Sequence, residues 1–158
     1  MRIAITPLIA VLIWSDVAPV YYQLALYLYT IASVTDYVDG YIARRLKVES
    51  PFGEMLDPIA DKLLIAAVLL ALASVQTSGW LFLVPALIIL IREFMISGLR
   101  EYLAKKNVSA PVTKLAKWKT TAQILALGFL MGAPGFPGFP FAREIGLILL
   151  WIAAILTV

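Results

Sequence analysis

Six apolar segments, separated by turn residues and charges, make up most of this chain and constrain its fold more than any other feature. They run approximately over residues 1–14, 20–45, 52–75, 79–105, 113–132 and 141–158. With 62% hydrophobic residues, 15% charged residues and a mean hydropathy of +0.92, the balance is not that of an ordinary soluble domain. We therefore expect an all-α integral membrane protein, a bundle of six transmembrane helices.

A single transmembrane domain over residues 1–158 is expected, because no composition shift or internal repeat marks a second one. The outer segments are short for membrane spans. The first offers fourteen residues before Ser15, and the last ends at Val158 without a polar anchor, whereas a span needs about 20 residues. We expect the chain to be truncated at both ends, and a re-entrant first segment is the alternative.

The distribution of positive charge predicts the orientation in the membrane. Lysines and arginines gather in the turn after the second segment and around the connection between the fourth and fifth, at Arg44, Arg45, Lys47, Lys105, Lys106, Lys114, Lys117 and Lys119. The positive-inside rule places these connections on the cytoplasmic side, together with both termini if all six segments span. A formal net charge of +3 suits contact with anionic membrane lipids and does not indicate nucleic acid.

Four aspartates fall within twenty-six residues of this apolar sequence, at Asp36, Asp39, Asp57 and Asp61. Ionised carboxylates in a membrane or a core are costly without a partner, so a shared cation is the simplest explanation. Oxygen ligands favour Mg²⁺ or Mn²⁺, and the chain has neither His nor Cys to hold zinc. Four carboxylates suffice for two ions.

Helical spacing brings these carboxylates to two faces. On one helix Asp36, Asp39, Gly40 and Ala43 fall within a stripe about 100° wide. On the next helix the residues Gly53, Asp57 and Asp61 share a face at four-residue spacing. Helices joined by a short turn are normally antiparallel neighbours, so the two faces can meet near the cytoplasmic end. A divalent-cation transport path is an alternative use of such a cluster, although broken helices or inverted repeats are more typical of transporters.

The full pattern resembles the motif of the CDP-alcohol phosphotransferases: Asp36-x-x-Asp39-Gly40-x-x-Ala43-Arg44, eight residues, then Gly53-x-x-x-Asp57-x-x-x-Asp61. Further stretches are similar to the bacterial phosphatidylglycerophosphate synthases within that family, namely Arg2-x-x-x-x-Pro7, Arg92-Glu93, Ser97-x-x-Arg100-Glu101 and Lys117-x-Lys119-Thr120-Thr121-Ala122-Gln123. The asparagine- and proline-rich stretch that such proteins carry before the first arginine is absent here, as is their polar tail.

The resemblance implies a phosphatidyltransferase of phospholipid biosynthesis in the bacterial cytoplasmic membrane. It would join CDP-diacylglycerol to sn-glycerol 3-phosphate, releasing CMP, with Mg²⁺ or Mn²⁺ held by the four aspartates. The same family chemistry with inositol phosphate, serine or another alcohol is the alternative. The resemblance further implies a homodimer, and it makes Asp61 the general base. CDP-diacylglycerol would contact a set that shares the motif: Asp36, Asp39, Gly40, Ala43, Arg44 and Gly53. The small residues among these have helix packing as their alternative role.

A dianionic acceptor needs cationic donors beside the metal site. Candidates for binding glycerol phosphate are Arg92, Arg100, Lys119, Thr120 and Lys62. Arg92 and Arg100 lie eight residues apart on one helix, and Arg92 is the deeper. A charge inside an apolar span faces a wet cavity or a partner. The alternative for Arg92 and Arg100 is a structural pair with Glu93 or Glu101, and for Lys62 it is a counter-charge to the aspartates.

Overall fold

The computed structural model describes residues 2–15, 17–46, 51–75, 79–106 and 114–157, and within these ranges the chain is helical apart from short turns. Side chains are described for the same ranges except at residues 2, 36–46, 51–58, 104–105 and 114–117. The helices are α1 (Arg2–Ser15), α2 (Pro19–Leu46), α3 (Pro51–Val75), α4 (Trp80–Lys105), α5 (Lys114–Gly135) and α6 (Ala142–Thr157).

These helices confirm the all-α class and follow the six apolar segments of the sequence. The clearest difference is at α5, which continues through Pro134 to Gly135 instead of ending at residue 132. Pro134 does not stop the helix early because the backbone N–H of Phe136 still donates to the carbonyl of Gly132 at 2.9 Å. The fifth segment, expected to end at residue 132, therefore continues as a helix for three more residues.

Gly79, the residue before α4, has a left-handed backbone conformation, at φ 55°. A residue without a β-carbon adopts this conformation at little cost, which a branched side chain cannot do. The carbonyl of Gly79 accepts from the N–H groups of Phe82 at 3.3 Å and Leu83 at 3.1 Å. Those two donors would otherwise lack partners in the first turn of the helix. Gly79 thus supplies both the left-handed turn before α4 and the acceptor for two N–H groups of its first turn.

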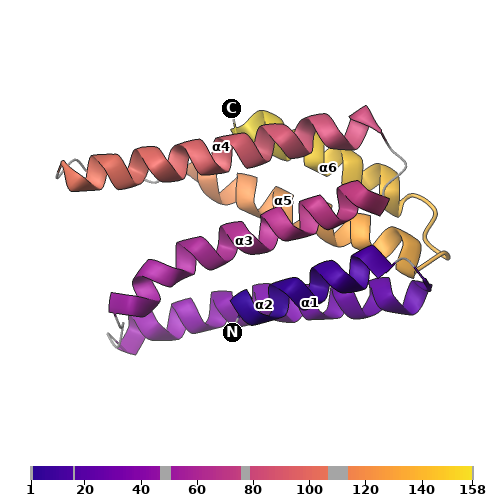
Figure 1. The fold of residues 1–158 in the computed structure, drawn as a ribbon, viewed down its shortest axis with the longest axis horizontal. Helices are drawn as coiled ribbons and strands as arrows, with labels where there is room; N and C mark the ends of the chain where they lie inside the picture. The colour runs from indigo at the N-terminus through magenta and orange to yellow at the C-terminus, as the bar shows by residue number, and fades with distance from the viewer. Residues whose placement is uncertain (1, 16, 47–50, 76–78, 107–113, 158) are drawn as a thin grey trace.

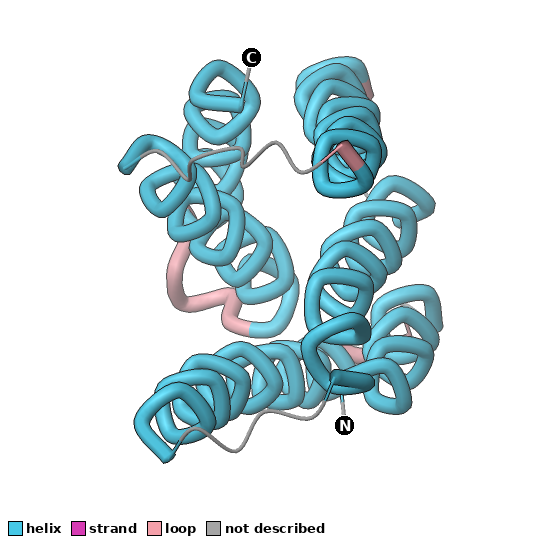
Figure 2. The backbone as a smooth tube through the Cα atoms, turned by 90° about the vertical axis from the view of Figure 1, so that its left-hand side faces the viewer, coloured by secondary structure: helices cyan, strands magenta, loops and turns pink. Residues whose placement is uncertain are grey.

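Successive helices run in alternate directions along the long axis of the molecule (Figure 1). α1 packs against α2 and α3, α5 packs against α6 and α2, and α4 packs mainly against α6. The C-terminal ends of α2 and α4 and the N-terminal end of α3 all lie at the left of Figure 1. Figure 2, seen from that end, shows the helix axes roughly along the line of view. Residues of α2, α3 and α4 are therefore brought to a common end of the bundle.

The core is formed by buried apolar side chains from all six helices, including Ile9, Ala25, Val68, Leu72, Phe82, Ile89, Leu127, Leu130, Leu150 and Ala153. Small residues allow the closest approach. A β-carbon at Gly135 of α5 would lie 3.3 Å from the backbone nitrogen of Gln23 in α2, whereas one at Gly128 or Gly132 would make only ordinary contact with the tip of Leu26, at 3.9 and 3.6 Å. The absence of a side chain at Gly135 thus allows α2 and α5 to lie close together at that level.

The outer surface of α4 is strongly apolar. Its exposed large side chains are Trp80, Leu81, Leu83, Val84, Leu87, Ile91, Phe94, Met95, Leu99 and Tyr102. Within the described residues, the stretch Trp80–Leu103 of this helix is long and apolar enough to cross a membrane. α1 has 14 residues and α6 has 16, which correspond to about 21 and 24 Å of helix against a hydrocarbon core of about 30 Å. A six-span topology remains a prediction.

Candidate active site

The aspartate motif lies where α2 ends and α3 begins. Asp36 and Asp39 belong to the last three turns of α2, and Asp57 and Asp61 belong to the first three turns of α3. Both segments are helical, as the spacing argument required. The side chains of Asp36, Asp39 and Asp57 lie outside the described part, as do those of Gly40, Ala43, Arg44 and Gly53. That the acidic faces of α2 and α3 meet is therefore still a prediction.

Asp61 is the one carboxylate of the motif whose side chain the structure describes, and it is exposed. It lies in the third turn of α3, immediately before Lys62. Among the side chains that the structure describes, no three carboxylates gather into a metal site. The donor set of the motif nevertheless fits a hard divalent cation, because all four of its candidate ligands are carboxylate oxygens.

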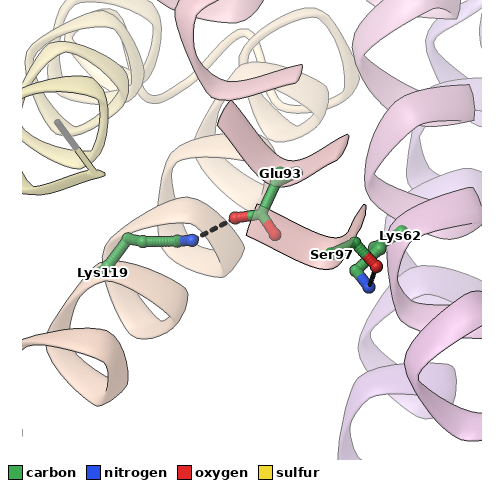
Figure 3. Close-up of polar contacts among 4 residues, drawn as sticks. All are labelled: Lys62, Glu93, Ser97 and Lys119. Carbon is green, nitrogen blue, oxygen red and sulfur yellow. Dashed lines mark hydrogen bonds and ion pairs between the residues drawn. The ribbon is translucent and has the colours of Figure 1, made fainter. Parts of the chain in front are cut away.

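Lys62 of α3 reaches across to α4. Its Nζ donates to the hydroxyl oxygen of Ser97, and both side chains are partly buried (Figure 3). The contact joins the helix that carries Asp57 and Asp61 to the helix that carries Arg92 and Arg100. Because the partner is a neutral hydroxyl, the positive charge of Lys62 is not cancelled there.

Lys119 of α5 also contacts α4, where it forms an ion pair with Glu93 (Figure 3). The two side chains are only 11% and 18% exposed. Glu93 and Ser97 are four residues apart, so they lie one above the other on one side of α4. The acceptor-site candidates Lys62 and Lys119 are thus both attached to a single short segment of this helix.

The other acceptor-site candidates occupy the same half of the bundle with different exposure. Arg92 is half-buried and Arg100 is exposed, which agrees with Arg92 being the deeper of the two. Thr120 is exposed, unlike its neighbour Lys119, and so lies on a different side of α5. The sequence left open a structural pair between Arg92 and Glu93. In the structure, the partner of Glu93 is Lys119 of α5 and not the adjacent arginine. A role of these three residues in acceptor binding stays a prediction.

An apolar groove of about 550 Å³ runs between α2 and α5. Its α2 wall includes Leu26, Thr30, Ser33 and Val34, and its other wall includes residues 124, 125, 128, 129 and 132 of α5 with Phe136 just after that helix. The absence of side chains at the two glycines of α5 leaves room for it. Val34 precedes Asp36 by two residues, or about 3 Å of helix, so the groove approaches the start of the aspartate motif.

Sequence reasoning named neither the groove nor the partners of the two lysines. Ser97 appeared only as part of a family-like stretch, and Glu93 only there and as an alternative partner for Arg92 or Arg100. The available signal was a glutamate in the middle of an apolar segment, where an ionised group needs a cationic partner. The sequence offers many lysines and arginines, and helix packing selects which one is near.

Comparison with known proteins bears on the whole chain. The family model for CDP-alcohol phosphatidyltransferase matches residues 1–158. A Rickettsia bellii (strain RML369-C) protein named CDP-diacylglycerol--glycerol-3-phosphate 3-phosphatidyltransferase is 43% identical over 157 residues, covering 99% of this chain and 84% of that protein. A protein of the same name from Rickettsia felis (strain ATCC VR-1525 / URRWXCal2) is 46% identical over 136 residues, covering 86% of this chain and 74% of that protein.

A more distant relative has a different name. A protein of Oryza sativa subsp. japonica named Cardiolipin synthase (CMP-forming) is 38% identical over 136 residues, covering 78% of this chain and 41% of that protein. The family match and the Rickettsia bellii likeness extend over the aspartate motif and the helices that carry the lysines. A cation transporter is not favoured. The protein belongs to the CDP-alcohol phosphatidyltransferase family.

Proposed function

We propose that this protein condenses CDP-diacylglycerol with sn-glycerol 3-phosphate to give phosphatidylglycerophosphate and CMP. The observation that carries the proposal is the 43% identity over 99% of the chain to a protein named for this reaction. The complete aspartate motif on α2 and α3 supports the same conclusion. Cationic side chains from α3, α4 and α5, at Lys62, Arg92 and Lys119, support an acceptor that carries a phosphate.

The lipid substrate accounts for the groove between α2 and α5. An open apolar groove lined by aliphatic, aromatic and small side chains suits an acyl chain. The groove ends within a turn of Asp36. An acyl chain lying there would place the attached pyrophosphate beside the motif, where Gly40, Ala43 and Gly53 leave the backbone accessible to the nucleotide.

The chemistry is a direct displacement at phosphorus. The 1-hydroxyl oxygen of glycerol 3-phosphate attacks the phosphorus that carries diacylglycerol, a new P–O bond forms, and the bond to the CMP phosphate breaks. Asp61 accepts the hydroxyl proton as general base. Mg²⁺ or Mn²⁺, two ions on this proposal, held by Asp36, Asp39, Asp57 and Asp61, would supply neutralisation of the charge that develops on the pyrophosphate. Arg44 would contact the nucleotide phosphates.

The acceptor is held by the cations of the other helices. Lys62, Arg92, Arg100 and Lys119, with Thr120, would bind the glycerol phosphate dianion. We place the site at the cytoplasmic end of six membrane spans, in a bacterial cytoplasmic membrane and in a homodimer. The apolar outer face of α4 supports insertion in a bilayer.

The test is CMP release from CDP-diacylglycerol by the purified protein in detergent with Mg²⁺. Glycerol 3-phosphate, inositol 1-phosphate, serine and phosphatidylglycerol are compared as acceptors. We expect turnover with glycerol 3-phosphate. The relative named cardiolipin synthase is the reason to include phosphatidylglycerol, and preference for it would keep the family chemistry but replace the acceptor. Lack of turnover with every acceptor would contradict the proposal.

A further inference from the structure

One short segment of α4 contacts the lysines of two other helices. Glu93 pairs with Lys119 of α5, and Ser97, one turn further along, accepts from Lys62 of α3. Figure 3 shows the two lysines approaching the segment from different sides. We call Glu93 and Ser97 the α4 clasp. It links three helices at the depth where the acceptor-site candidates lie.

The ion pair between Glu93 and Lys119 carries a desolvation cost, because both charges are largely buried. The side chains of Lys119 and Glu93 are only 11% and 18% exposed, so both charges are largely removed from solvent. Replacing such a pair by apolar residues of similar size is often neutral or stabilising, so packing alone does not explain it. Structural cohesion of α4 is also supplied elsewhere: Trp151 of α6 donates to the carbonyl of Leu81 at 3.0 Å, near the other end of the helix.

The direction of Lys119 gives the second argument. It lies five residues after the start of α5, about 8 Å along the helix. Side chains on a helix lean toward its N-terminus, and a lysine near a helix end normally extends its ammonium group outward to the polar surface. Here the ammonium group is turned inward to Glu93 instead. The carboxylate therefore determines where this positive charge is held.

Each lysine keeps donors that the clasp does not use. An ammonium group has three N–H donors, and the described contact of Lys119 and that of Lys62 each occupy one of them. Glu93 balances the charge of Lys119 while the acceptor is absent, which lowers the cost of burying it. Among the described side chains, these contacts leave two donors on each ammonium group for a phosphate.

We propose that Glu93 and Ser97 are positioning residues that hold the Lys119 and Lys62 ammonium groups for the phosphate of the alcohol acceptor. The inference rests on the proposed function and deepens it. It assigns the recognition of a phosphorylated acceptor to cations from α3 and α5 that α4 orients. Loss of either positioning residue weakens acceptor binding and leaves binding of the liponucleotide unchanged.

The first test measures KM for each substrate in Glu93→Gln, with Glu93→Asp as the conservative variant and Glu144→Gln as the matched control. Glu144 is an exposed glutamate in the first turn of α6. We expect Glu93→Gln to raise KM for glycerol 3-phosphate by about 10-fold to 100-fold, as loss of an orienting group does at other sites, with KM for CDP-diacylglycerol unchanged. Glu93→Asp should recover part of the loss, and Glu144→Gln should match the unsubstituted protein.

Ser97→Ala and Ser97→Thr provide the same test for Lys62. The alanine variant should raise KM for glycerol 3-phosphate by about 10-fold, and the threonine variant, which keeps the hydroxyl, should recover most of the loss. Thermal unfolding in detergent shows whether each variant is folded. Equal loss of affinity for both substrates in folded variants would overturn the inference.

The double variant Glu93→Lys with Lys119→Glu separates positioning from a structural ion pair. It restores an opposite-charge pair but moves the ammonium group from α5 to α4. We expect the unfolding midpoint to return toward that of the unsubstituted protein while KM for glycerol 3-phosphate stays raised. Recovery of KM in the double variant, or an unchanged or lowered KM in Glu93→Gln, would overturn the inference. If the unsubstituted protein releases no CMP with glycerol 3-phosphate, the proposed function fails instead.

Discussion

Gly146 of α6 lies directly against Leu130 of α5. A β-carbon at Gly146 would be 2.8 Å from Cγ of Leu130 and 3.1 Å from its backbone nitrogen. Both residues are buried, and Leu130 is fully so. Because one of the close atoms belongs to the backbone, a side-chain rotation cannot relieve the contact. The glycine therefore sets how closely the last two helices approach.

Gly146→Ala should destabilise the protein by pushing α5 and α6 apart. Overpacking of a close helix contact costs about 1–3 kcal/mol, which should appear as a lower unfolding midpoint in detergent. Gly98→Ala is the matched control, since nothing lies within 4 Å of a β-carbon at that position in α4. Alanine favours a helix over glycine by about 1 kcal/mol, so the control should keep or raise the midpoint. Equal midpoints in the two variants would contradict this account of the α5–α6 contact.

Asp61→Asn should abolish most of the transferase activity while leaving the protein folded. The amide has the size of the carboxylate but cannot accept the hydroxyl proton of the acceptor. General base catalysis contributes about 10²- to 10⁴-fold, and we expect CMP release to fall by at least the lower figure. The unfolding midpoint and retention in the membrane fraction serve as the folding control. Activity near that of the unsubstituted protein would exclude Asp61 as the base.

Removal of divalent cations should stop the reaction. The motif offers carboxylate oxygens only, and the chain has no cysteine or histidine, so Mg²⁺ or Mn²⁺ should restore the activity after treatment with EDTA. Isothermal titration of the EDTA-treated protein with Mn²⁺ should show binding that Asp36→Asn weakens. Full CMP release in the presence of excess EDTA would rule out the metal site proposed for the four aspartates.

Thr30→Phe should obstruct the groove between α2 and α5. Thr30 lines the groove and its hydroxyl donates to the carbonyl of Leu26 at 2.8 Å. A phenyl ring there competes with an acyl chain, so KM for a long-chain CDP-diacylglycerol should rise on the order of tenfold, equivalent to about 1.4 kcal/mol. KM for a dioctanoyl analogue should rise less.

Ile31→Phe is the control for the groove prediction. Ile31 is 57% exposed on the next position of α2 but does not line the groove. Its substitution adds the same aromatic ring outside the proposed acyl site, so the KM values should stay unchanged. A similar rise in both variants would point to a general effect on α2 and against acyl binding in the groove.

Much of the secondary structure could be predicted because apolar segments and turn residues are local signals. The bounds of α2, α3 and α4 agree with the sequence to within one residue, since turns and charges interrupt the apolar runs at those points. The extension of α5 through Pro134 was missed. A proline normally discourages helix, and only the continued hydrogen bonding of the last turn shows that this one is tolerated.

The same distinction between local signals and tertiary contacts applies to the site. The four aspartates and their helices follow from spacing within one short stretch of chain, and the family resemblance rests on those residues. The ion pair between Glu93 and Lys119 does not follow from spacing, because the two residues are 26 positions apart and on different helices. Several other cations are closer to Glu93 along the chain, and Arg92 is adjacent to it.

The sequence by itself determined that this protein is helical, that its carboxylates are collected at the junction of α2 and α3, and to which family it belongs. Those properties depend on local periodicity and on residues within a few turns of one another. The tertiary structure alone decided the α4 clasp, the groove between α2 and α5 and the contact of Gly146 with Leu130. Each of these depends on which helix faces are adjacent, and the packing of all the helices sets that adjacency together.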